Sequence, residues 1–283
     1  MHRFVGLLLL ASLCLAGTSF AQEKVRFAPL PMENRETVVK QFRPLTDFLQ
    51  ERLGITIEYV YADSYNDLLK KFRNGEIDLA YQGPLPYVRL RANYPQAEPL
   101  VHFKEASGQA TYTCSLVAFA DSRPDLKGLA GERVALTQSL STCGYLSTNG
   151  LLRRYGSSLE QNRYRYLGTH DAVALGVVRG EFDLGGLKTA IARKYAHMGL
   201  SMLTETAPLP GFALVANKAT LKPELQTRIR QAIVELAPQG DDKKMLESWG
   251  DNIRYGAVPA EDSHYDAVRQ LLGGVEIPDK GNF

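Results

Sequence analysis

The sequence predicts an α/β protein built as two lobes, each with a mainly parallel β-sheet flanked by helices, connected by two hinge strands. Three observations support this prediction. Strand-like and helix-like segments alternate from residue 25 onward, and a helix–glycine–strand segment occurs twice. Two apolar, extended segments are also suited to carry the chain from one lobe to the other and back. Alternation of this kind is typical of βαβ units and parallel sheets.

The first residues have the features of a cleavable export signal. Arg3 supplies a positive charge, residues 5–16 are apolar, and small residues occupy positions 19 and 21, where a signal peptidase reads the chain. The apolar run is about a dozen residues long, shorter than the roughly 20 that span a bilayer. We therefore expect a signal peptide at 1–21 and a periplasmic mature protein that begins near Gln22. An uncleaved N-terminal anchor is the alternative.

Composition excludes several classes of protein. The 283 residues are 45% hydrophobic, and 33 Lys and Arg balance 31 Asp and Glu for a net charge of +2. A long disordered chain would have fewer apolar residues, and a nucleic-acid-binding protein would have a basic excess. No later stretch has the 18 or so apolar residues of a membrane span. The chain also has no nucleotide-binding, nucleophile-elbow or zinc-protease motif, so the sequence gives no support for an enzyme, a metal or a cofactor.

The first lobe begins with five regular elements. Phe42, Leu45 and Leu49 follow helical spacing in the first helix, and β-branched residues dominate the strand that comes next. Ser64 and Asp67 form the start of a second helix, which Gly75 ends. In chain order we expect a strand, a helix, a strand, a helix and a strand at 25–28, 35–52, 55–61, 64–74 and 77–81.

One part of this pattern recurs after 105 residues. The segment 74–79 (NGEIDL) is echoed by 179–184 (RGEFDL), and in both a helix stops at glycine before an apolar strand. A common α/β connection is one explanation of the echo, and two similar lobes, each with its own sheet, are the other. On the second interpretation, residues 22–113 and 212–283 form one lobe and 114–211 the other. The linkers then lie near 111–119 and 211–217, and helices near 223–236 and 263–272 pack back on the first lobe.

A loop of small polar residues follows the predicted strand 133–136. Ser141, Thr142, Cys143 and Gly144 precede a helical stretch, so backbone N–H groups and hydroxyls should meet at a helix start. Such an arrangement suits an anion, because the N–H dipoles point at one place. The simpler alternative is that Ser141 or Thr142 only caps the helix.

Two further positions belong to the same predicted lobe. His170 precedes Asp171 at a loop-to-helix junction, where Asp171 would cap the helix and the imidazole would lie near its start. Lys188 ends a predicted strand, and ligands of open α/β sheets collect at such ends. A polar surface histidine and a solvated lysine are the alternatives. Since a cleft forms between two lobes, we expect a small ligand there.

Cys114 and Cys143 are the two cysteines of the expected mature chain. An oxidising compartment favours a disulfide between them. Free thiols remain an alternative, and so does a catalytic Cys143 with His170 as its base.

Several segments together resemble the periplasmic phosphate-, phosphite- and phosphonate-binding proteins of ABC transporters. The resemblance runs over nearly all of residues 24–240 and keeps the segments in order. They are 29–34 (PLPMEN), 79–84 (LAYQGP), 140–145 (LSTCGY), 168–173 (GTHDAV) and 208–211 (PLPG).

This resemblance implies a two-lobed, type II-like periplasmic binding protein that closes by hinge motion and passes a small phosphorus oxyanion to a membrane permease. In the family a serine/threonine loop holds the oxyanion, a histidine approaches it and a first-lobe tyrosine closes over it. The residues singled out here are Tyr81, Ser141, Thr142, Cys143, His170 and Asp171.

Two departures from the family pattern affect the expected ligand. Cys143 replaces a usual serine, and Lys188 stands where an acid often binds an amino group. Both favour an inorganic oxyanion or an acidic phosphonate over an aminophosphonate. The related arsenite-binding sensor proteins, which depend on cysteine and signal to a membrane histidine kinase, are the main alternative. A monomer without nucleic acid is expected in either case.

Overall fold

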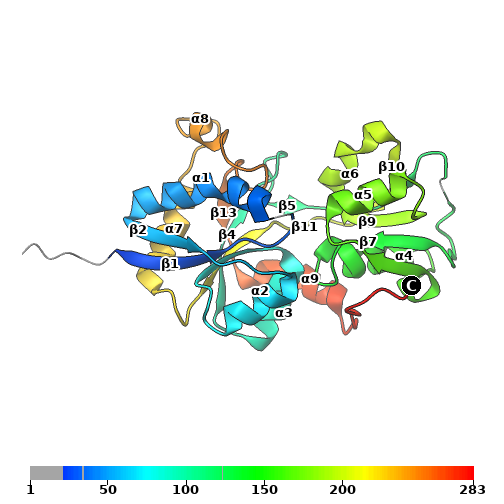
Figure 1. Cartoon of the computed structure of the whole chain (residues 1–283), viewed down its shortest axis with the longest axis horizontal. Helices are drawn as coiled ribbons and strands as arrows, with labels where there is room; N and C mark the ends of the chain where they lie inside the picture. The colour runs from blue at the N-terminus through cyan, green and yellow to red at the C-terminus, as the bar shows by residue number, and fades with distance from the viewer. Residues whose placement is uncertain (1–21, 34, 123) are drawn as a thin grey trace, which may run out of the picture.

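The computed structural model describes residues 22–33, 35–122 and 124–283 as two lobes side by side (Figure 1). The two-lobed α/β prediction is confirmed. The expected signal peptide lies outside the described residues. Within them, no helix combines the length and the apolar character that a membrane crossing requires.

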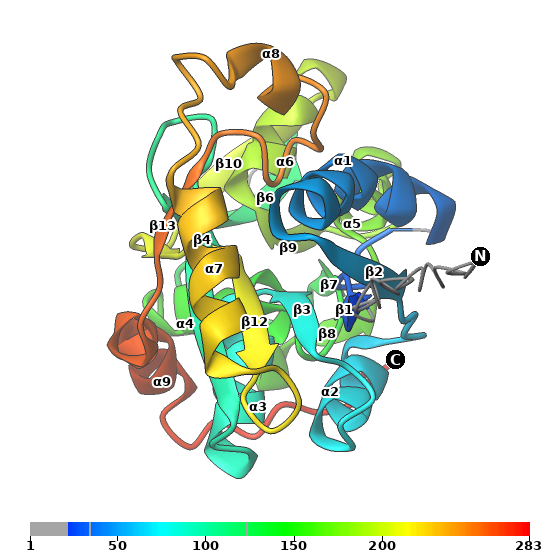
Figure 2. The same cartoon turned by 90° about the vertical axis from the view of Figure 1, so that its left-hand side faces the viewer.

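The first lobe contains a six-stranded sheet. Its strand order is β13 (Ala257–Pro259), β4 (Ala97–Phe103), β12 (Ala213–Asn217), β3 (Leu79–Gln82), β1 (Glu23–Ala28) and β2 (Ile55–Tyr59). Figure 1 shows α1 on one side of these strands and α2 and α3 on the other. Figure 2 shows α7 in front of β12 and β4. The helices of this lobe are α1 (Arg35–Leu53), α2 (Tyr65–Arg73), α3 (Pro84–Asn93), α7 (Pro223–Val234), α8 (Lys243–Leu246) and α9 (Asp266–Leu272).

The second lobe contains a five-stranded sheet with a core on each face. Its strand order is β10 (Leu200–Glu205), β6 (Cys114–Phe119), β9 (Leu184–Lys188), β7 (Arg133–Leu136) and β8 (Arg163–Tyr166). Neighbouring residues of β6 serve opposite faces, since Leu116 belongs to one core and Val117 to the other. The helices are α4 (Ser147–Arg153), α5 (His170–Val178) and α6 (Thr189–Lys194). Shorter helical turns lie at Thr142–Leu146, Leu159–Gln161 and Ala196–Met198 in this lobe and at Asp262–Tyr265 in the first.

Both sheets are mixed, whereas the sequence suggested mainly parallel ones. β1 pairs in parallel with β2 and β3, and β7 does so with β8 and β9. The remaining strands are antiparallel to their neighbours, beginning with β12 beside β3 and β6 beside β9. The reason is topological: β6 and β12 are the first strands after each passage between lobes, and both enter their sheets opposite to the βα units.

The passage between lobes is shorter than expected. β5 (Thr111–Tyr112) pairs with β11 (Leu209–Pro210) to form a two-stranded ribbon between the lobes (Figure 1). The rest of the expected linkers, 114–119 and 213–217, forms β6 and β12 inside the sheets. These strands are mostly apolar because both of their faces are buried. Their composition is therefore also what a buried linker would have.

The internal repeat corresponds to a shared structural unit. Gly75 and Gly180 both adopt positive φ, +72° and +69°, after α2 and α5. The aspartates three residues later make matching contacts. Asp78 accepts hydrogen bonds from the Arg26 backbone N–H at 2.7 Å and from its guanidinium at 2.6 and 2.9 Å. Asp183 does the same with Arg133 at 2.8 Å and at 2.7 and 3.0 Å. The two-lobe interpretation of the repeat therefore agrees with the structure.

The C-terminal segment crosses to the second lobe, although we expected 212–283 to stay with the first. Val275 and Ile277 pack against the cores of both lobes. Asn282 N–H donates to the Tyr164 carbonyl at 3.0 Å, and the Tyr166 hydroxyl donates to the Pro278 carbonyl at 2.8 Å. The end of the chain lies on the second lobe in Figure 1. The segment covers β8, an edge strand whose free N–H and C=O groups favour such a partner.

Candidate functional site

A buried pocket lies where the carboxyl ends of β7, β8 and β9 meet the first lobe. Each strand is followed by, or ends at, residues that line the pocket: Ser141–Cys143 after β7, His170 after β8 and Lys188 at the end of β9. The first lobe and the hinge ribbon supply the opposite wall. Its residues are Leu30, Tyr65, Gly83, Pro86, Tyr112 and Phe212.

The loop after β7 presents hydroxyl groups to this pocket. Ser141 and Thr142 are only 5% and 4% exposed. The Leu85 N–H of α3 donates to the Thr142 hydroxyl oxygen at 3.0 Å, and the same hydroxyl is also hydrogen-bonded to Tyr112. A ligand oxygen would therefore take the Thr142 proton in place of Tyr112. Gly144 allows the loop to turn tightly, because a Cβ there would lie 2.6 Å from the Gln138 carbonyl oxygen. The fold therefore requires glycine at this position and brings both hydroxyls inside.

His170 faces the pocket as a neutral donor. The Lys188 backbone N–H donates to His170 Nδ1 at 3.1 Å, so in the neutral ring the hydrogen resides on Nε2. Burial lowers the pKa of His170 to about 4, and the positive charge of Lys188 acts in the same direction against a smaller opposing effect of Asp171. The histidine can therefore donate one hydrogen bond to an anion without itself carrying a charge.

Lys188 supplies the positive charge of the pocket wall, and it is already paired. Its Nζ lies 2.7 Å from Glu105 Oε1, and the two side chains are 9% and 21% exposed. Lys188 belongs to the second sheet, whereas Glu105 follows β4 of the first. The ion pair thus links the two lobes beside the pocket.

Two tyrosines that sequence reasoning did not select line the pocket. Tyr65 begins α2, and Tyr112 belongs to the hinge strand β5. Burial raises the pKa of both phenols, and a hydrogen bond with Thr142 opposes the shift at Tyr112. Tyr65 follows a strand end and a helix cap, which is the same signal that selected His170. Tyr112 had no such signal, because an aromatic residue in an apolar linker is typical of a core.

Tyr81 and Asp171 lie beside the pocket instead of lining it. Tyr81 is 1% exposed, and its ring stacks on Phe212 with centroids 5.3 Å apart. Tyr81 therefore packs behind the pocket residue Phe212, inside the core of the first lobe. Asp171 lines a neighbouring cavity of about 60 Å³ that also contacts Glu33. The cap of α5 is Thr169, whose hydroxyl accepts from the Ala172 N–H at 3.2 Å, so Asp171 does not cap the helix as expected.

The structure contains the Cys114–Cys143 disulfide, with a Cα–Cα distance of 5.1 Å. It joins the first strand of the second lobe to the loop that carries Ser141 and Thr142. Cys143 still lines the pocket, but its sulfur is bonded and carries no thiol. Neither a thiolate site for arsenite nor a nucleophilic Cys143 is compatible with this bonded pair.

Contacts between the lobes enclose the pocket. Besides the Leu85–Thr142 bond, Gln138 Nε2 of the second lobe donates to the Pro31 carbonyl of the first at 3.2 Å. The free volume at the pocket centre is about 10 Å³, about that of a single water site. This conformation is therefore a closed one with almost no free space at the centre of the pocket.

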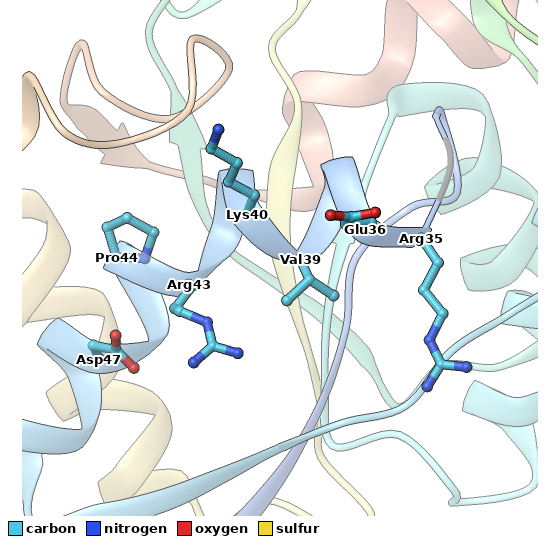
Figure 3. Close-up of a pocket in the computed structure, with 7 residues that line it drawn as sticks. All are labelled: Arg35, Glu36, Val39, Lys40, Arg43, Pro44 and Asp47. Atoms are coloured by element: carbon cyan, nitrogen blue, oxygen red, sulfur yellow. The ribbon is translucent and has the colours of Figure 1, made fainter.

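A larger hollow lies elsewhere and does not involve the predicted residues. It has a volume of about 700 Å³, and all its lining residues come from α1. Figure 3 shows charged side chains along this helix, among them Arg35, Lys40 and Arg43. They project in different directions and do not converge on a common point. We therefore place the candidate site in the buried pocket between the lobes.

Comparison with known proteins decides the family. Residues 27–265 match the model of a family described as the periplasmic substrate-binding protein of phosphonate ABC transporters. The chain belongs to this family. Its members are binding proteins that serve transport, and the family is periplasmic.

Individual relatives from this phosphonate-binding family share only a minority of their residues with this chain. The phosphate-import protein PhnD of Mycolicibacterium smegmatis is 28% identical over 273 residues, covering 88% of this chain and 85% of the relative. A probable phosphite-binding ABC transporter protein, PhnD1 of Prochlorococcus marinus, is 23% identical and covers 61% of each chain.

A solved structure shows the same fold. PhnD1 of Prochlorococcus marinus in complex with methylphosphonate superposes with a TM-score of 0.75 at 19% identity, covering 88% of this chain and 97% of that one. At this identity the similarity establishes the fold of the phosphonate-binding family, and the site must be argued from the residues of this chain.

Proposed function

We propose that this protein captures a small phosphorus oxyanion of the phosphite, phosphonate or phosphate type between its lobes and delivers it to an ABC permease. One observation carries the proposal. Ser141, Thr142, His170 and Lys188 come from three separate strand ends and line one buried pocket. Each has a polar hydrogen suited to a negatively charged oxygen.

The chemistry of the pocket favours an anion over a cation or a neutral ligand. Hydroxyl groups, a neutral imidazole and the N–H groups of a helix start are hydrogen-bond donors. No carboxylate lines the pocket among the described residues, and Glu105 is occupied by Lys188 just beyond it. An oxyanion with several equivalent oxygens can use all these donors at once. Charge-assisted hydrogen bonds of this kind are the strong ones.

The names of the relatives support phosphorus as the central atom of the ligand. Their names include phosphate import and phosphite binding, and the solved structure carries methylphosphonate. We also propose that residues 1–21 are a signal peptide that directs the chain to the periplasm. In that compartment the Cys114–Cys143 disulfide would be stable, and a permease in the inner membrane would be within reach.

Titration calorimetry on ligand-free protein tests the proposal. We expect saturable binding of phosphite, phosphate or methylphosphonate with one site per chain. Thr142→Val keeps the size of the side chain but removes a donor to a charged group, which costs on the order of 1.5–3 kcal/mol, or about 10- to 150-fold in affinity. Thr227→Val, at an exposed position of α7, is the matched control and should bind like wild type. Absence of binding for all three ligands, or equal affinity of the Thr142→Val variant, would contradict the proposal.

A further inference from the structure

Lys188 separates three neighbouring spaces. It lines the anion pocket, the 60 Å³ cavity beside Asp171 and a cavity of about 250 Å³ on the hinge side. The hinge-side cavity is also lined by Glu105, Thr113 and Arg193. The lysine side chain is thus a shared wall, and its removal would join the small pocket to the larger space.

Several contacts fix this wall in place. Lys188 Nζ is 2.7 Å from Glu105 Oε1 and lies 5.6 and 5.4 Å from the ring centroids of Tyr112 and Phe212. Aromatic faces attract a cation at such distances. At its other end, the backbone N–H of Lys188 is bonded to His170. The side chain therefore spans the gap from the second lobe to the first with both ends held.

Resting on the proposed function, we propose that Lys188 and Glu105 form a specificity gate. The gate restricts the pocket to phosphorus oxyanions whose fourth substituent is a hydrogen, a hydroxyl or a methyl group. Phosphonates with a longer aminoalkyl chain are excluded. The Lys188 side chain fills the route toward the hinge-side cavity, so a longer substituent has no space.

Charge reinforces the exclusion by size. An ammonium group near Lys188 would be repelled, because like charges at close range are unfavourable. Glu105 has the charge to attract an ammonium group, but Lys188 already compensates it at 2.7 Å. Removing the lysine side chain reverses both conditions. It opens the route and leaves the Glu105 carboxylate free to pair with an ammonium group.

The experiment compares phosphite with 2-aminoethylphosphonate by calorimetry. Wild type should bind phosphite at least on the order of 100-fold more tightly than 2-aminoethylphosphonate. Lys188→Ala should gain binding of 2-aminoethylphosphonate by on the order of tenfold or more, as expected for a new charge-assisted contact. Lys188→Met keeps the length without the charge and should show no such gain. The double variant Lys188→Ala/Glu105→Gln should lose most of the gain.

Lys222→Ala is the matched control, since it removes an exposed lysine that pairs with Glu23 on the first lobe. Its ligand preference should equal that of wild type. Thermal melting checks that each variant is folded, and the wild-type preference is a test that needs no variant. Equal affinity of wild type for both ligands would overturn the gate, as would a Lys188→Ala variant that folds, binds phosphite and gains nothing. If wild type binds none of the phosphorus oxyanions, the proposed function itself fails.

Discussion

At the scale of single residues, the environment of His170 determines how the pocket presents a proton. His170 Nδ1 accepts a hydrogen bond from the Lys188 backbone N–H. The ring hydrogen is therefore on Nε2, where it can be donated to a ligand. Burial and the nearby lysine hold its pKa at about 4, below the ordinary 6.5. The same neutral donor is thus present across the pH range in which a periplasmic protein works.

This assignment predicts how stability depends on pH. Because the folded pKa is lowered, the unfolded chain takes up the proton first as the pH falls. The contribution of His170 to stability is complete above pH 6.5 and is lost between 6.5 and about 4. The melting temperature of His170→Asn should therefore fall less than that of wild type over this interval. His102, whose pKa burial also lowers to about 4, is unchanged in both proteins.

Nitrogen-15 NMR of the imidazole gives the direct check. The His170 ring should remain neutral, with hydrogen on Nε2, from pH 8 down to pH 5. A midpoint near 6.5 would contradict the assigned environment.

Local signals explain why much of the site could be predicted. Ser141, Thr142, His170 and Lys188 occupy strand ends or helix starts, which short sequence patterns mark. Glu105 had no such signal, because it lies in a loop and meets Lys188 across 83 positions of the chain. Contacts of that range depend on how the lobes close. Asp171 was expected to be a cap, but the hydroxyl of Thr169 stands one residue before the helix and takes that role.

At the scale of elements, the two Arg–Asp pairs hold equivalent strands together in the two lobes. Asp78 and Asp183 each bind an arginine on the neighbouring parallel strand through its backbone and its guanidinium. The pairs differ in burial, since the Asp78 side chain is 5% exposed and that of Asp183 is 32% exposed. Their common geometry allows the effect of burial to be compared within one molecule.

Breaking these pairs should therefore have unequal effects. Asp78→Ala removes a buried carboxylate that accepts three hydrogen bonds from Arg26 and should cost on the order of 2–3 kcal/mol of unfolding free energy. Asp183→Ala removes a pair that water partly screens and should cost on the order of 1 kcal/mol. Urea unfolding of both variants measures the difference. Equal losses, or a larger loss at Asp183, would show that burial does not control the strength of these pairs.

The positions of helices and strands were predicted better than the directions of the strands in their sheets. Helix spacing and glycine stops located α1, α2 and α5 because these signals act within one turn of chain. The direction of a strand in its sheet depends on where the chain enters, and nothing in the apolar runs of β6 or β12 records it. The same limit applies to the C-terminal segment, whose alternating apolar residues do not reveal which lobe they contact.

The C-terminal segment should contribute to the stability of the second lobe. Ending the chain after Gly274 removes Val275 and Ile277 from both cores and leaves the β8 edge uncovered. Two partly buried side chains and a few hydrogen bonds amount to on the order of 3 kcal/mol. Chemical unfolding should show this loss, whereas exposed Lys280→Ala should be neutral. A truncated chain as stable as wild type would mean that the segment only rests on the lobe.

At the scale of the whole molecule, two lobes joined by a short ribbon and by the C-terminal segment enclose the pocket with residues from both sides. The Leu85–Thr142, Gln138–Pro31 and Lys188–Glu105 contacts exist only while the lobes are together. A ligand that is held by second-lobe donors and also contacts the first-lobe wall therefore favours closure, since it binds the closed form more tightly.

Small-angle scattering should detect this closure. Ligand-free protein should have a larger radius of gyration than protein saturated with phosphite, because the lobes separate about the β5–β11 ribbon when no ligand joins them. The Thr142→Val variant should need more phosphite to reach the compact state. Identical profiles with and without saturating ligand would count against hinge closure.

In the proposed function, one phosphorus oxyanion lies between the lobes on donors from three strand ends of the second lobe. A crystal structure of the protein with phosphite tests it most directly. We predict phosphorus density in the buried pocket, with oxygens within hydrogen-bond distance of the Ser141 and Thr142 hydroxyls and of His170 Nε2. Phosphite bound at another surface, or a closed pocket that stays empty at saturating phosphite, would contradict the account.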